Sequence, residues 1–64
     1  MPDIDFIRAE IAHMRRQVDR LRGEIRLLQR SGISSTSADA LLERMLNKID
    51  DLCTERDRLA GPPW

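Results

Sequence analysis

The fold is decided by residues 4–28, which read IDFIRAEIAHMRRQVDRLRGEIRLL. Apolar side chains recur in this stretch at alternating steps of three and four residues, which is the pattern of a coiled-coil seam. β-Branched residues occupy the first seam position of every heptad. The seam consists of Ile4, Ile7, Ile11, Met14, Val18, Leu21, Ile25 and Leu28. We therefore predict one long helix over residues 4–30 that packs against another helix.

Charged residues flank the seam in a sorted pattern. Parallel copies would place these opposite charges across from each other, whereas antiparallel copies would bring like charges together. The residues before the first seam position are Asp3, Glu10, Gln17 and Glu24, and those after the second are Arg8, Arg15, Arg22 and Gln29. This pattern favours a parallel dimer through the first helix, by about 0.2–1 kcal/mol for each exposed pair.

A second helix is expected over residues 38–60, after a loop at residues 31–37 and before a tail at residues 61–64. Gly32 can adopt the left-handed conformation that ends a helix, and the hydroxyl-rich residues 34–37 favour a helix start. The apolar residues of the second helix cover about 140°, against about 120° for the first, so this face could contact two neighbours. They are Leu41, Leu46 and Cys53, together with Leu42, Met45, Ile49 and Leu52, which we assign to the packed face.

The chain has 64 residues and one cysteine. A chain of this size buries only about 60% of its unfolded surface, and one small core rarely supplies more than about 3–5 kcal/mol. Because a lone thiol cannot form an internal disulfide, a second copy is the remaining source of stability. We predict an all-α fold, an antiparallel helical hairpin that dimerises into a four-helix bundle or coiled coil. If the hairpin occupies the seam first, the alternative is an antiparallel dimer built mainly on the second helix.

Arg56 interrupts the apolar arc of the second helix, about one turn before its end. A buried guanidinium without a partner is strongly destabilising. In an antiparallel hairpin, Arg56 lies level with Ile11 and within reach of Glu10. We therefore predict an ion pair between Glu10 and Arg56, within one chain or between two. The alternative is that Arg56 extends its charged end into water.

Two large apolar residues, Phe6 and Leu27, lie outside the seam. We expect both to be buried, Phe6 beneath Trp64 at the open end of the hairpin and Leu27 beneath Ile33 and Leu41 near the loop. If they were exposed, they would mark a patch for a binding partner.

The residues offer little for catalysis. His13 and Cys53 are the only soft metal ligands, but His13 lies off the seam, and Cys53 lies on the apolar edge, where a packed thiol is common. The 11 acidic residues are spread over outer helix faces, and the three glycines are isolated. Neither an acid–base pair nor a phosphate-binding loop is therefore predicted. We expect no enzyme activity, no cofactor and no metal site.

Composition favours a cytoplasmic protein without membrane contact. Basic and acidic residues balance at 11 each, so the net charge is zero. No stretch approaches the roughly 20 apolar residues that span a bilayer, and the N-terminus lacks an apolar run of signal-peptide length. A single free thiol is compatible with a reducing compartment.

The predicted function is that of a non-enzymatic small oligomerisation or adaptor protein, which acts through helix–helix contacts with itself and with a further, unidentified protein. The alternative is a small nucleic-acid-associated regulator that contacts phosphates through Arg16, Arg20 and Arg30 of the first helix. Asp19 and Glu24 interrupt this basic run, and no aromatic residue is interleaved for base stacking. Nucleic acid is therefore the weaker prediction.

Overall fold

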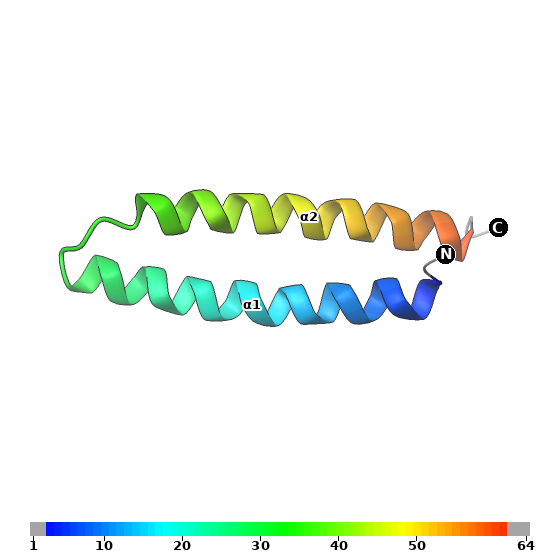
Figure 1. Ribbon diagram of the computed structural model, residues 1–64, viewed down its shortest axis with the longest axis horizontal. Coiled ribbons are helices and arrows are strands. Elements are labelled where there is room, and N and C mark those ends of the chain that lie inside the picture. Colours follow the sequence, from blue (N-terminus) through cyan, green and yellow to red (C-terminus); the bar gives the residue numbers. More distant parts are fainter. Residues whose placement is uncertain (1–2, 62–64) are drawn as a thin grey trace.

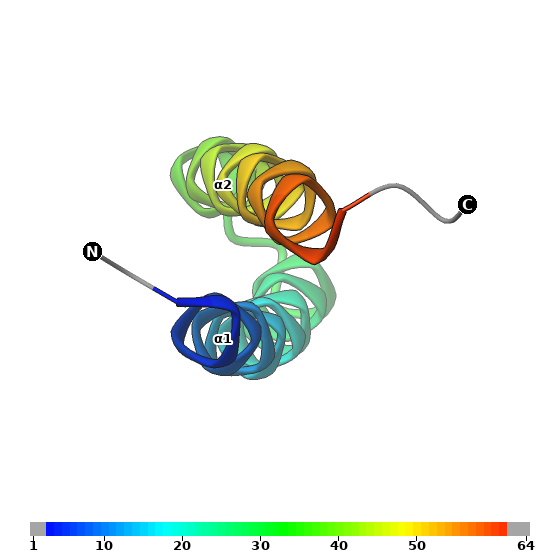
Figure 2. The same ribbon diagram turned by 90° about the vertical axis from the view of Figure 1, so that its right-hand side faces the viewer.

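A computed structural model describes residues 3–61 of the chain, and these form two helices joined by a short loop. Helix α1 spans Ile4–Arg30 and helix α2 spans Thr36–Ala60. The helices run antiparallel beside each other, so that residues 3 and 61 lie at the same end (Figure 1). Seen end-on, their axes are inclined to one another (Figure 2). The predicted all-α helical hairpin is confirmed.

Both ends of α1 are fixed by local hydrogen bonds. At its start, the Asp3 carboxylate accepts the backbone N–H of Phe6 at 2.8 Å, a cap worth about 0.5–2 kcal/mol. At its end, Gly32 has a φ of +70° and donates its N–H to the carbonyl of Gln29 at 3.2 Å. The N–H of Ile33 returns to the carbonyl of Leu28 at 2.9 Å. These two bonds form a Schellman motif, which explains why α1 stops at Arg30.

Helix α2 begins at Thr36, two residues earlier than the sequence predicts, so the loop is residues 31–35. Ser35 is the residue before the helix, and its carbonyl accepts the N–H of Asp39 at 2.8 Å. The Ser35 hydroxyl donates to the Asp39 carboxylate at 3.0 Å, while the Ser34 hydroxyl accepts the N–H of Thr36 at 3.4 Å. Serine and threonine cost little helix stability in the first turn, because backbone N–H groups there have no helical partner. The sequence prediction left Thr36 and Ser37 in the loop and therefore placed the start of α2 too late.

The core lies almost entirely on α1. The exposed fraction is 3% for Ile11 and 8% for Leu21, with the remaining buried side chains between these values. The buried residues of the hairpin are Ile7, Ile11, Val18, Leu21 and Ile25, whereas Ile4, Met14 and Leu28 of the seam are half-buried. Helix α2, which is described over its whole length, has no fully buried residue. Its packed-face residues Leu42, Met45, Ile49 and Leu52 are all half-buried.

The hairpin is a rod with extents of 50 × 22 × 15 Å. Its radius of gyration is 15.0 Å, against about 11 Å for a compact domain of this length. Its accessible surface is 5057 Å², whereas a compact monomer of this mass exposes about 4,200 Å². The 64-residue chain as a whole therefore exposes about 850 Å² more surface than a typical folded chain of its mass.

The expected burial of Phe6 and Leu27 is wrong. Phe6 is 56% exposed and Leu27 is 63% exposed, and Ile33, which was expected to cover Leu27, is itself 57% exposed. Both residues lie on α1 more than a right angle away from the centre of the seam, because successive residues turn by about 100°. Helix α2 packs on the seam and cannot reach them. The predicted contact between Phe6 and Trp64 lies outside the described residues.

Candidate interaction surface

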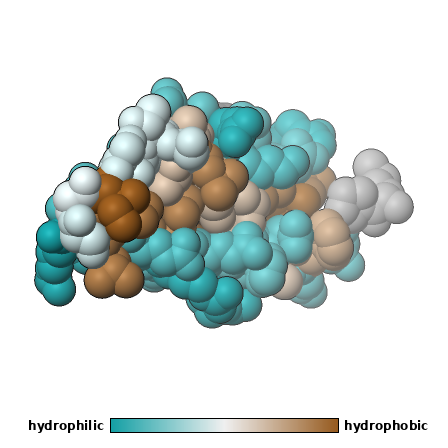
Figure 3. Space-filling model, turned by 60° about the vertical axis from the view of Figure 1, so that its left-hand side comes forward, coloured by the Kyte–Doolittle hydropathy of each residue, from teal (hydrophilic) through white to brown (hydrophobic). Residues whose placement is uncertain are grey.

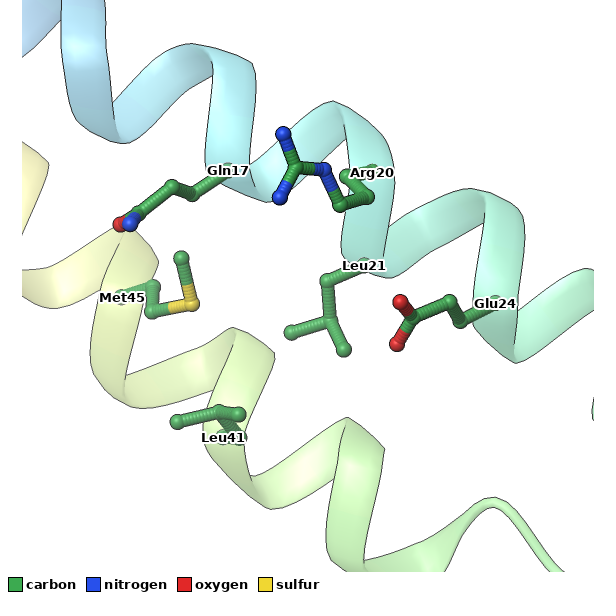
Figure 4. Close-up of a pocket in the computed structure, with 6 residues that line it drawn as sticks. All are labelled: Gln17, Arg20, Leu21, Glu24, Leu41 and Met45. Carbon is green, nitrogen blue, oxygen red and sulfur yellow. The ribbon is translucent and has the colours of Figure 1, made fainter.

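A groove runs along one side of the hairpin between the two helices. It encloses about 410 Å³ and is lined by Gln17, Arg20, Leu21 and Glu24 of α1 and by Leu41 and Met45 of α2. Leu21 points from α1 into the space between the helices, toward Leu41 and Met45 (Figure 4). We call this feature the Leu41 groove. It has an apolar floor, and its polar residues all come from α1.

Apolar side chains gather in a band between the two helices, with hydrophilic side chains on both sides (Figure 3). Within this band the most exposed side chains belong to α2, whereas the more exposed Phe6 and Leu27 of α1 lie outside it. Leu41 is 43% exposed and Leu46 is 39% exposed. At about 100° per residue, these two side chains lie at opposite edges of the α2 apolar arc, roughly 140° apart. Helix α1 covers the centre of the arc and leaves both edges in water.

Of the apolar residues that line the groove, the sequence assigns Leu21 and Met45 to the packed faces but not Leu41. The signal that could have found Leu41 is the width of the α2 arc, because one neighbouring helix cannot cover about 140°. The sequence did indicate that such a face can contact two neighbours. Only one neighbour is present in the hairpin.

The α1 seam is already occupied by α2, and this conflicts with the expected parallel dimer through α1. Its central residues Ile11 and Val18 are only 3% and 4% exposed, so a second copy could pack there only if α2 were displaced. The flanking arginines Arg8, Arg15 and Arg22 are exposed. Their charge pattern alone, at about 0.2–1 kcal/mol for each exposed pair, cannot compensate for opening the hairpin core.

Arg56 does not pair with Glu10 within one chain. Its Nε lies 3.2 Å from Oδ1 of Asp57, and its side chain is 32% exposed. Among residues 3–61, no ion pair joins Glu10 to Arg56. The guanidinium therefore pairs with the next residue of its own helix and not with a residue of α1. Because Asp57 is adjacent in sequence, this contact does not depend on how the two helices are aligned. A Glu10–Arg56 pair between two chains stays a prediction.

We expect the substitution Arg56→Leu to stabilise the protein. It would remove a half-buried charge from an apolar arc and add apolar contacts, for a gain of about 1 kcal/mol. For a chain of this size, that gain corresponds to a rise in Tm of about 4–8 °C. Thermal melts at equal protein concentration measure it. Glu10→Ala tests the pair that stays a prediction between two chains: an unchanged Tm excludes that pair, whereas a fall in Tm for both variants shows that the two side chains interact.

Arg58 and Glu55 form a second ion pair near the open end of α2. Arg58 donates from Nε to Oε2 of Glu55 at 3.1 Å and from Nη2 to Oε1. These hydrogen bonds lower the pKa of Glu55 below its usual 4.5 and raise the pKa of Arg58.

The three arginines of the nucleic-acid alternative are all exposed on α1. Arg20 borders the Leu41 groove together with Glu24 (Figure 4). Arg16 and Arg30 lie about 21 Å apart along the helix axis, at a rise of about 1.5 Å per residue. The hairpin therefore does not gather these residues into one compact basic patch.

Neither a metal centre nor a membrane span occurs in the described part of the chain. His13 is exposed and Cys53 is half-buried as a free thiol. Within residues 3–61, no three side chains of His, Cys, Asp or Glu come together in a way that could hold a metal ion. Neither α1 nor α2 combines the length and apolar character needed to cross a membrane.

The chain matches no protein-family model, no curated protein and no solved structure. Its most distinctive feature is the incompletely covered apolar face of α2.

Proposed function

We propose that this chain is a small, non-enzymatic oligomerisation or adaptor protein that acts through helix–helix contacts, with a homodimer of hairpins as its working form. The incomplete burial of α2 is the observation that supports this proposal. Its apolar arc runs the length of the helix, yet no residue of the helix is fully buried in a single hairpin. A helix with such a wide apolar face normally packs against two neighbours.

The area of uncovered surface supports the same proposal. The chain as a whole exposes about 850 Å² more than a compact chain of its mass, and each partner in a standard protein–protein interface buries about 800 Å². A second hairpin placed over the α2 face would bring the surface into the normal range and complete a four-helix core. The half-buried free thiol of Cys53 suits a reducing compartment, and we place this activity in the cytoplasm.

Sedimentation equilibrium over a series of concentrations tests the proposal. We expect the mass to rise from 7.4 kDa toward twice that value as concentration increases. Helicity and Tm should rise in parallel, because association stabilises only the folded chain. A fully helical monomer at every concentration down to the nanomolar range would overturn the proposal.

A nucleic-acid titration separates this function from its rival. An adaptor of zero net charge should give a flat anisotropy curve with a fluorescent DNA or RNA duplex at low salt. A regulator that uses Arg16, Arg20 and Arg30 would bind the duplex and lose affinity steeply as salt rises. The second result would favour the nucleic-acid function.

A further inference from the structure

We infer that two hairpins meet through an antiparallel contact between their α2 helices, in a single register centred midway between Ile49 and Asp50. This inference rests on the proposed self-association and specifies which surface and which alignment produce it. The occupant of the exposed α2 edge at the Leu41 groove is thus a second copy of this chain.

A charged stripe lies on α2 beside the Leu41 groove. It consists of Arg44, Lys48, Asp51 and Glu55, spaced four, three and four residues apart. Such spacing places the four side chains on one side of a helix. Arg44, Lys48 and Asp51 are exposed, and Glu55 is half-buried. Two positive charges are therefore followed by two negative charges along one outer edge of α2.

Two of the three neighbouring pairs in this stripe are unfavourable within a single helix. Like charges four residues apart repel each other, as in Arg44 with Lys48 and Asp51 with Glu55, whereas Lys48 and Asp51, three residues apart, attract. Glu55 is paired with Arg58 of its own helix, whereas among residues 3–61 none of Arg44, Lys48 and Asp51 forms an ion pair that would offset this repulsion. A partner that offers the same stripe in the reverse direction would place each charge opposite its complement.

The charges select one register of the antiparallel pair. A two-fold axis midway between Ile49 and Asp50 sets Arg44 opposite the partner's Glu55 and Lys48 opposite the partner's Asp51. Sliding one helix by a heptad would instead set Arg44 against the partner's Lys48, or Asp51 against the partner's Glu55. A parallel pair in register would align every charge with its own kind.

The same register aligns the exposed apolar residues. Leu41 falls opposite the partner's Leu59, with an offset of about 1.5 Å along the axis, and Met45 falls within about 3 Å of the level of the partner's Leu52. Met45, Leu52 and Leu59 are half-buried, and Leu41 is exposed. All four lie on the groove side of α2, next to the charged stripe. The apolar contacts and the charge pairs therefore require one and the same alignment.

Charge reversal at the centre of the stripe tests this register. We expect Lys48→Glu and Asp51→Lys each to raise the dimer Kd by about tenfold, because each turns two symmetric attractions into repulsions. The double variant K48E/D51K restores opposite charges and should return Kd to near the wild-type value. Asp50→Lys is the matched control: it reverses a neighbouring exposed charge on the other side of the apolar arc, and should leave Kd unchanged.

The outcomes of these measurements distinguish a failure of the register from a failure of the proposed function. Helicity of each variant, measured at a concentration where the wild-type chain is fully associated, establishes that the variant folds. If the wild-type chain dimerises but the single reversals leave Kd unchanged, or the double variant fails to restore it, the register is wrong and self-association stands. If the wild-type chain remains a monomer at every concentration, the proposed function fails and the register with it.

Discussion

Replacing Ile11 with alanine is expected to unfold most of the protein. Ile11 is 3% exposed, the lowest value in the core, and lies on the seam where α1 meets α2. Truncation of a buried isoleucine to alanine costs about 2–5 kcal/mol, because the lost contacts leave a cavity. A lone core of this size supplies only about 3–5 kcal/mol. Far-ultraviolet circular dichroism with urea titration should show a large loss of helix before any denaturant is added.

Leu27→Ala is the matched control on the same helix. Leu27 is 63% exposed, so its truncation should change the free energy of unfolding by no more than about 0.5 kcal/mol. The two variants separate packing on the seam from general helix propensity, because both place alanine in the interior of α1. Equal urea midpoints for Ile11→Ala and the wild-type chain would contradict the described core.

Replacing Leu41 with aspartate is expected to abolish self-association at micromolar concentration while the hairpin still forms. Leu41 is 43% exposed in a single hairpin, so it contributes little to the core of one chain. Full burial of a leucine is worth about 1.5–3 kcal/mol, so the 43% of Leu41 that is still exposed contributes roughly 0.6–1.3 kcal/mol. A two-fold interface contains this contribution twice, and aspartate adds the cost of burying an unpaired charge at both places. Kd should therefore rise by on the order of a hundredfold or more, as measured by sedimentation equilibrium.

Leu46→Asp is the control for this substitution. Leu46 is 39% exposed, nearly the same as Leu41, and lies on the same helix at the opposite edge of the apolar arc. If the Leu41 groove carries the contact, Leu46→Asp leaves Kd close to the wild-type value. A larger loss of association for Leu46→Asp than for Leu41→Asp would move the interface to the other side of the hairpin.

The parts of the fold that sequence predicts well are those set by local chemistry. The range of α1 follows from the seam, and its end follows from Gly32, whose positive φ and backbone hydrogen bonds have the expected form. The start of α2 is less well predicted because several hydroxyl residues in succession can each precede a helix. Ser35 takes that position through its bonds to Asp39.

Sequence predicts poorly those features for which two surfaces or side chains compete for the same partner. The flanking charges of α1 favour a parallel dimer only if the seam is free, and α2 covers the seam within the same chain. Arg56 has one carboxylate beside it in sequence and another across the hairpin, and it pairs with the adjacent Asp57. Leu41 stands out from the other apolar residues of α2 only in the folded hairpin. Its side chain is part of the apolar face that stays exposed after α1 has packed against α2.

The five-residue loop at residues 31–35 also determines how this protein can present anything joined to it. Because the chain turns back once, residues 3 and 61 lie at the same pole of a body 50 Å long (Figure 1). In the antiparallel pair, the two copies would point these poles in opposite directions. In the proposed register, residue 61 of each copy lies about 17 Å along α2 from the two-fold axis, so segments fused to either terminus would be held on opposite ends of a symmetric strut, about 35 Å apart along its length.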